Sequence, residues 1–179
     1  MAAVVAVAIA GPTGDWVFDG DEAAILTDTD RILAELEPGV IVTWNGANFD
    51  LPFIADRAGG HGLTLGLKLA HDANMAGRHK PLPGHPGPYR ARWHRHGHLD
   101  AYQLYRADVG AVLGLPCGLK PLSRYVGLPV VEVDRNRIHE LSVDEQRAYV
   151  ASDARLTRML AQRRPAALTA VDQLADSIG

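Results

Sequence analysis

Apolar residues recur along this chain at two spacings, one typical of strands and one typical of helices. Val4 to Ala10 is a continuous apolar run that a Gly/Pro turn ends, which predicts a buried strand. The last long helix has the clearest start, because Ser142 and Glu145 form an S-x-x-E capping box before a helical run. In chain order, the expected elements are a strand over residues 4–10, a hairpin strand over 16–18, a helix from about 21 to 36, a strand over 40–44, a short helix over 52–58, a weak strand over 63–70, a loop over 72–97, a strand end running into a helix over 98–113, a short helix near 119–128, and a helix from 142 to about 164 with a short helix after it.

Strands mixed with helices predict an α/β or α+β layered domain. The 179 residues fit one domain, 1–179, with a substantial core, and no internal repeat or domain boundary divides them. The first eleven residues also resemble the apolar part of a signal peptide. They lack its positively charged start, so a buried strand is the better interpretation.

Composition narrows the class of protein. The apolar fraction of 47% and the charged fraction of 22% are those of a soluble globular protein, and no apolar run is long enough to span a bilayer. A lone Cys117 excludes an internal disulfide and favours a reducing, cytoplasmic location.

A basic stretch lies within a chain whose net charge is −3. No acidic residue occurs between Asp72 and Asp100, and the segment contains Arg92, Arg95, three further cations and five histidines. Such a segment can face a polyanion, and a solvated loop explains it equally well.

Two aspartates lie next to apolar segments that are expected to be buried, where a carboxylate is unusual. Asp50 follows the strand over 40–44, at the carboxyl end where α/β domains place their sites. Asp153 lies four residues after Tyr149, on the helix face that continues through Leu156 and Leu160. A buried carboxylate needs a partner or a metal. The alternatives are a helix N-cap for Asp50 and an ion pair with an arginine for Asp153.

These stretches resemble the second and third motifs of the DEDDy 3'–5' exonucleases, the DnaQ-like branch of the ribonuclease H-like fold. Asn45, Phe49 and Asp50 match the second motif, and Tyr149 and Asp153 match the third. The proline after Asp50 and the HLDAY segment resemble the proofreading-type members related to family B DNA polymerases. The resemblance implies a mixed sheet flanked by helices over nearly the whole chain.

The resemblance also implies a chemistry. In this family two divalent cations, Mg or Mn, are held by four carboxylates, here including Asp50 and Asp153. Tyr149 would orient or help deprotonate the attacking water, and Asn45 and Phe49 would contact the 3'-terminal nucleotide of single-stranded DNA or RNA. The candidates for contacts with the nucleic-acid backbone are Arg92, Arg95 and Lys120.

The family's first motif, Asp-x-Glu on a central strand, has no match here. The run over residues 4–10 is similar to the family's second strand, so we expect an N-terminally truncated domain whose sheet has open edges around an absent central strand. Two of the four metal carboxylates are then lacking, and low activity is expected. A nucleic-acid-binding domain without catalysis and a fragment that does not fold alone are the alternatives, and a partner polymerase or helicase is not visible from the sequence.

Overall fold

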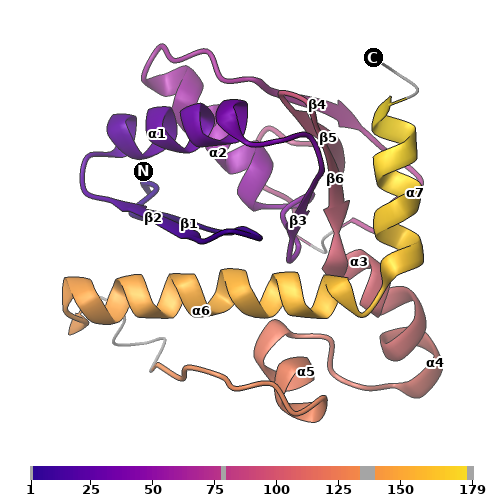
Figure 1. Ribbon diagram of the computed structural model, residues 1–179. Helices are drawn as coiled ribbons and strands as arrows, with labels where there is room; N and C mark the ends of the chain where they lie inside the picture. The colour runs from indigo at the N-terminus through magenta and orange to yellow at the C-terminus, as the bar shows by residue number, and fades with distance from the viewer. Residues whose placement is uncertain (1, 78–79, 134–139, 177–179) are drawn as a thin grey trace.

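The computed structural model describes residues 2–77, 80–133 and 140–176 (Figure 1). Its elements are β1 (Ala6–Ala10), β2 (Asp15–Asp19), α1 (Glu22–Glu35), β3 (Val40–Thr43), α2 (Asp50–Gly60), β4 (Leu67–His71), β5 (Tyr89–Trp93), β6 (His96–Asp100), α3 (Ala101–Tyr105), the π-helix η1 (Arg106–Gly110), α4 (Ala111–Leu113), α5 (Leu119–Tyr125), α6 (Val143–Gln162) and α7 (Pro165–Asp176).

The strands form two separate sheets. β1 and β2 make an antiparallel hairpin, and the second sheet has the order β3-β6-β5-β4. β3 and β6 run parallel, while β4, β5 and β6 alternate in direction, so the larger sheet is mixed. Within the described part of the chain, β1 pairs only with β2, and β3 only with β6, so each of these two strands keeps one unpaired edge.

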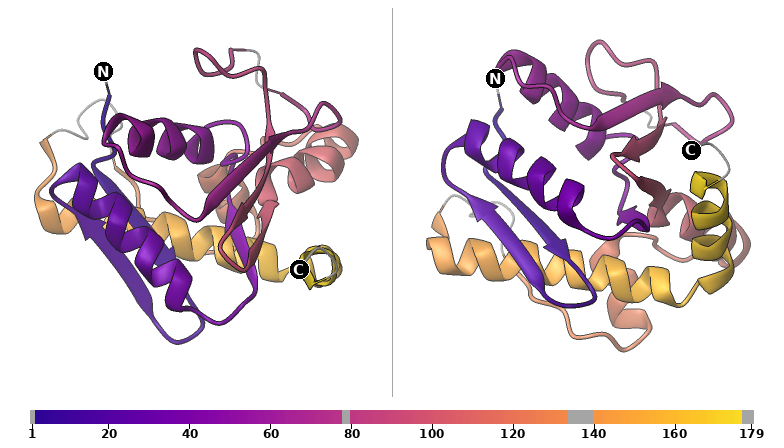
Figure 2. Two further views of the ribbon diagram at one scale, coloured as in Figure 1. Left: turned by 90° about the horizontal axis from the view of Figure 1, so that it is seen from above. Right: turned by 45° about the horizontal axis from the view of Figure 1, so that its top comes forward.

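Helices cover both faces of this arrangement. α6 runs beneath the hairpin and reaches β3, while α1 and α2 lie on the opposite side (Figures 1 and 2). α7 turns away from the end of α6 and packs on β6 and β3, and α5 packs on α6. The result is the mixed α/β fold that the sequence predicts, and it is consistent with a ribonuclease H-like exonuclease fold.

The long helices begin where their capping residues predict. Ser142 caps α6, with its side chain accepting a hydrogen bond from the Glu145 N–H while the Glu145 carboxylate accepts one from the Ser142 N–H. Asp21 caps α1 and accepts from the Ala24 N–H at 3.0 Å. Both starts confirm the sequence prediction.

Three apolar clusters hold these layers together. The first lies between α1 and α2, the second between α1 and the larger sheet, and the third between α3, α5 and α6. Their buried members are Val4, Ile25, Leu26 and Ala58 in the first, Leu33, Leu51 and Trp93 in the second, and Tyr105, Leu122 and Leu160 in the third.

The prediction of a loop over residues 72–97 is wrong for the second half of that segment. Residues 89–93 and 96–100 form β5 and β6, and the loop ends near Pro88. Tyr89, Ala91 and Trp93 alternate with two arginines, and Trp93 is buried, so the segment does carry a strand period. Its many basic and histidine side chains obscured that period. α2 also begins at Asp50, two residues earlier than predicted.

Candidate active site

The turn over residues 44–49, which joins β3 to α2, is held by one buried carboxylate. Asp100 ends β6, directly opposite Thr43 at the end of β3, because these parallel strands pair in that register. Its Oδ1 accepts from the Asn45 N–H at 2.8 Å, and its Oδ2 accepts from the Ala47 N–H at 3.0 Å. Oδ1 also accepts from the Tyr102 N–H at 3.1 Å, so Asp100 is in addition the N-cap of α3.

The environment of Asp100 opposes its charge. The carboxylate is 5% exposed, and burial raises its pKa, although the hydrogen bonds from backbone N–H groups act in the opposite direction. The sequence analysis did not predict that Asp100 holds the 44–49 turn, because that contact spans 55 residues of chain.

Asn45 sits in an unusual backbone conformation. Its φ is 69°, in the left-handed region that asparagine tolerates better than most residues. The Asn48 Nδ2 donates to Asn45 Oδ1 at 3.3 Å and to the carbonyl of Ala76 at 3.4 Å. The backbone conformation of the turn is therefore a sufficient reason for an asparagine at position 45, without any contact to a nucleotide. The turn also leaves the Asn45 Nδ2 without an acceptor among the described residues.

Phe49 and Asp50 follow on the same turn. The Phe49 ring is 37% exposed and stacks on Phe53, with ring centroids 5.8 Å apart and an interplanar angle of 10°. Asp50 is exposed and is the first residue of α2, while Phe49 occupies the capping position without a side-chain cap. The N-cap alternative for Asp50 therefore does not describe this helix.

Tyr149 and Asp153, which match the third motif, both contact a lysine. Lys120, on α5, is 5% exposed, and its Nζ lies 2.7 Å from Asp153 Oδ1 and 4.2 Å from the centroid of the Tyr149 ring. The same Nζ donates to the Val131 carbonyl. The ion-pair alternative for Asp153 is thus what the structure shows, with a lysine in place of the expected arginine. In this arrangement Lys120 is an internal cation rather than one presented at the surface.

The carboxylates that the structure describes do not gather into a metal site. Within residues 2–77, 80–133 and 140–176, no three His, Cys, Asp or Glu side chains come together around a point where an ion could sit. Asp153 already has a cationic partner, and Asp50 belongs to a different element. The donor set described here does not fit the two-metal site that the resemblance implies.

The two arginine candidates lie away from the turn. Arg92 is in register with Gly97, and Arg95 immediately precedes β6, so both are near the amino end of a strand whose carboxyl end is Asp100. Arg92 donates to the His94 carbonyl, and Arg95 donates to the Leu36 carbonyl. The structure does not bring them to the turn that carries Asn45.

A hollow of about 420 Å³ opens beside Asn45 instead. Its walls bring together the turn, the segment after β4 and the start of η1. The lining residues are Asn45, Asn48, Ala76, Gly77, Lys80, Tyr102 and Arg106. The sequence carried a signal for part of it, since Tyr102 and Arg106 are four apart in a predicted helix and so share a face.

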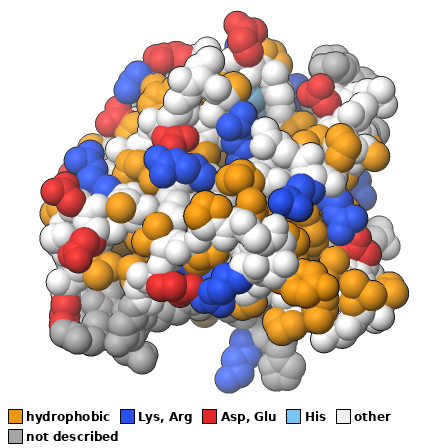
Figure 3. Space-filling view, turned by 60° about the horizontal axis from the view of Figure 1, so that its bottom comes forward, with side chains coloured by type: hydrophobic (Ala, Val, Ile, Leu, Met, Phe, Trp, Pro, Cys, Tyr) orange, Lys and Arg blue, Asp and Glu red, His pale blue; other side chains and the backbone are white. Residues whose placement is uncertain are grey.

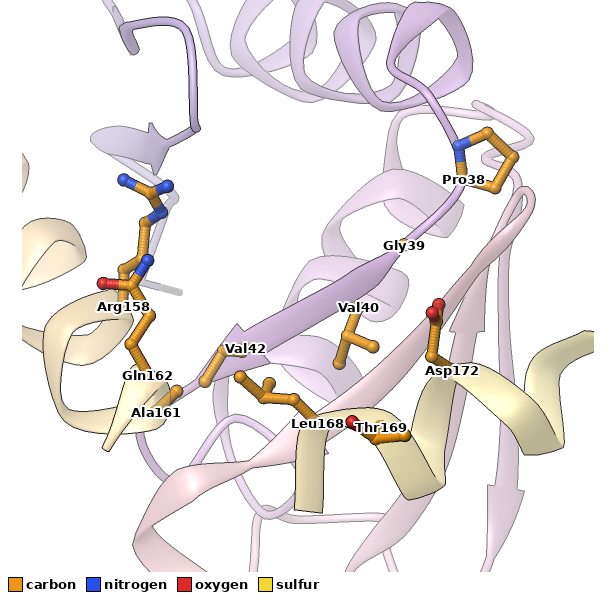
Figure 4. Close-up of a pocket in the computed structure, with 10 residues that line it drawn as sticks. All are labelled: Pro38, Gly39, Val40, Val42, Arg158, Ala161, Gln162, Leu168, Thr169 and Asp172. Carbon is orange, nitrogen blue, oxygen red and sulfur yellow. The ribbon is translucent and has the colours of Figure 1, made fainter. Parts of the chain in front are cut away.

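A second hollow lies between β3, the end of α6 and α7 (Figure 4). Val40 and Val42 face the end of α6 and the start of α7 there, and Arg158 stands at its rim. It contains none of the residues that the motifs select. On the face turned forward in Figure 3, basic and acidic side chains are interspersed, so that face offers no field of a single sign. No helix that the structure describes is long and apolar enough to cross a membrane.

Comparisons with known proteins agree with the motifs. Residues 16–80 match the model of the exonuclease domain of DNA polymerase family B, a segment that includes the 44–49 turn and Asp50. Two DNA polymerase epsilon catalytic subunits from Arabidopsis thaliana are each 29% identical to this chain over 132 residues. The match covers 72% of this chain and 6% of each relative, so the chain spans only a small part of the relatives' length. Together, the family match and the two relatives show that this chain is similar, over part of its length, to the exonuclease domain of DNA polymerase family B and to DNA polymerase epsilon catalytic subunits.

Proposed function

We propose that this chain is a nuclease domain that binds the 3' end of a single strand and hydrolyses it stepwise to nucleoside monophosphates. The observation that carries the proposal is the 44–49 turn. It lies within the segment matched by the polymerase exonuclease family, at the carboxyl end of β3, and a buried carboxylate holds it in place. Groups that are already held in place lose less conformational freedom when they bind a ligand.

The side chains of the turn suit a nucleotide. Phe49 has one ring face on Phe53 and an exposed remainder, and an exposed aromatic ring stacks on any base. The Asn45 Nδ2 can donate to a base edge or a phosphate oxygen. Both relatives are catalytic subunits of a DNA polymerase, so single-stranded DNA is the first substrate to test and RNA the second.

A requirement for Mg or Mn is part of this proposal. Asp50 and Asp153 are the proposed protein ligands, with Tyr149 as the group that orients water. Because the described carboxylates do not gather into a metal site, further ligands must complete it, and Asp153 must exchange its contact with Lys120 for a metal. We therefore expect a weak and metal-limited activity. A cytoplasmic location, which the lone Cys117 favours, is also part of the proposal.

A second function is favoured by the Lys120–Asp153 pair. An ammonium group 2.7 Å from the carboxylate satisfies its charge without a metal. A domain in this state would bind single strands and leave them intact. Metal dependence separates the two functions, since binding without catalysis persists in a chelator.

The experiment is a gel assay on a 5'-labelled single-stranded DNA oligonucleotide, with Mn or with EDTA. Asp153→Ala is compared with the parent chain and with Asp172→Ala, which removes an exposed aspartate of α7 as a matched control. Shortening from the 3' end that is lost in EDTA and in Asp153→Ala, and kept in Asp172→Ala, supports the nuclease. An intact oligonucleotide that is still retarded on the gel refutes the nuclease and supports the binding domain. If the parent neither shortens nor retards it, both functions are refuted for this chain.

A further inference from the structure

We infer that the hollow beside Asn45 is a phosphate-binding site, in which Lys80 and Arg106 clamp the backbone of the single strand. This inference rests on the proposed binding of a single strand and adds the residues that hold its phosphates. Neither cation belongs to the motifs, and Arg106 lies outside the basic stretch of the sequence.

Both cations are available for a ligand. Lys80 and Arg106 are exposed, and neither makes an ion pair with any other residue that the structure describes. The acidic side chain nearest to Arg106 in sequence, Asp108, is paired with Arg164 at 2.7 Å. Several other arginines are already paired with carboxylates within the protein. A hollow with two unpaired positive charges attracts an anion.

The lining also offers neutral donors. Asn45 and Asn48 bring two amide side chains to the hollow, and the Asn45 Nδ2 is the one that lacks an acceptor within the described residues. Tyr102 adds a half-buried ring, packed edge-on against Trp44 at 6.3 Å between centroids. Two cations, an amide donor and an aromatic wall match the phosphate and base of a nucleotide, a combination typical of single-strand grooves.

The position of Arg106 is set by an irregular helix. α3 passes into the π-helix η1 at Arg106, and π-helical turns within helices frequently occur at functional sites. On the opposite side, the chain around Ala76 is fastened by the Gln103 Nε2 at 2.7 Å and by the Asn48 Nδ2 at 3.4 Å, both donating to the Ala76 carbonyl. Ala76 is thereby tied to the same turn that Asp100 anchors.

The site has a measurable signature in salt. Each phosphate contact on a single strand contributes about 0.7 to the slope of log affinity against log salt. Loss of two contacts should lower the magnitude of that slope by about 1.4, which corresponds to roughly 25-fold weaker binding at about 0.1 M salt. Neutral contacts of the turn would leave the slope unchanged.

The test is fluorescence anisotropy with a labelled single-stranded oligothymidylate in EDTA, over a series of salt concentrations. Lys80→Ala/Arg106→Ala is compared with Arg31→Ala/Arg158→Ala, which removes the same charge from α1 and from the rim of the other hollow. The charge-retaining variant Lys80→Arg/Arg106→Lys is the rescue. Circular dichroism spectra that match the parent show that each variant is folded.

We expect the slope to fall by about 1.4 in the first variant only, and to return in the rescue. An unchanged slope in that variant, an equal fall in the control variant, or a parent chain that does not bind the oligothymidylate in EDTA would each overturn the inference. The outcome is independent of catalysis. An intact oligonucleotide in the Mn assay with a slope that depends on Lys80 and Arg106 refutes the nuclease and leaves the phosphate site standing.

Discussion

Replacement of Asp100 by asparagine tests whether one carboxylate organises the 44–49 turn. In Asp100→Asn, the remaining oxygen can keep the hydrogen bonds from the Asn45 and Tyr102 N–H groups, which share Oδ1. The new amide nitrogen then faces the N–H of Ala47, a residue that is fully buried. A buried donor without an acceptor destabilises by about 1–3 kcal/mol.

The two remaining hydrogen bonds also weaken, because their acceptor is no longer charged. That change amounts to about 1 kcal/mol for each bond, and the lower desolvation of a neutral side chain offsets part of it. The free energy of unfolding should therefore fall by about 3 kcal/mol. Asp172→Asn, on the exposed side of α7, should change it by less than about 0.5 kcal/mol.

The assay is urea unfolding at about pH 7 followed by circular dichroism, with the slope of free energy against urea compared between variants. A loss below about 0.5 kcal/mol with an unchanged slope would refute the reasoning, since it would mean that the Ala47 N–H finds another acceptor. Binding of the oligothymidylate is the second measurement. A folded Asp100→Asn protein that binds as tightly as the parent would show that Asp100 does not set the geometry of the turn.

Three further tests probe the surroundings of this turn. Burial lowers the pKa of His98 from 6.5 to about 4, so the native state favours the neutral ring. The protein should therefore lose about 3 kcal/mol of unfolding free energy as the pH falls from about 6.5 to about 4. Urea unfolding across this pH range should show the loss in the parent but not in His98→Gln. Lys120→Met should destabilise the protein by about 3 kcal/mol, because it leaves a carboxylate of α6 without its partner, and thermal unfolding should show recovery when that carboxylate is also replaced by alanine. A Cβ at Gly46 would overlap the Thr43 side chain, so Gly46→Ala should lower stability by about 1–3 kcal/mol; at Gly39, where no atom lies within 4 Å of a Cβ, urea unfolding should show a far smaller change.

Sequence patterns predicted the strands and helices that depend on interactions between residues close together in the chain. The capping box at Ser142 and the apolar run over residues 4–10 both describe interactions between near neighbours, and both elements are present. Local patterns failed over β5, where arginines on one face of the strand obscured the alternation of Tyr89, Ala91 and Trp93 on the other. A strand buried on one face only looks like a polar loop when its composition is read without its period.

The residues of the candidate site also fall into two groups, those that the sequence predicts and those that only the structure shows. Asn45, Phe49 and Asp50 were selected by a short motif, and they share one turn because they are neighbours in the chain. The partners of that turn were hidden, because Asp100 reaches it only through the parallel pairing of β3 and β6. Lys120 and Asp153 are likewise brought together only by the packing of α5 on α6.

Most strands and helices, the starts of the long helices and the turn that carries the second motif can be predicted from the amino-acid sequence. These follow from hydrophobic period, capping and chain proximity, which act over a few residues. Which charged side chains are paired and which are available to a ligand becomes clear only from the folded chain. Lys120 is occupied by Asp153, while Lys80 and Arg106 line a hollow beside Asn45 with no acidic partner in the part of the chain that the structure describes. The strength of a charge pair depends on the distance between the two groups in space, and the paired groups here lie far apart in the chain.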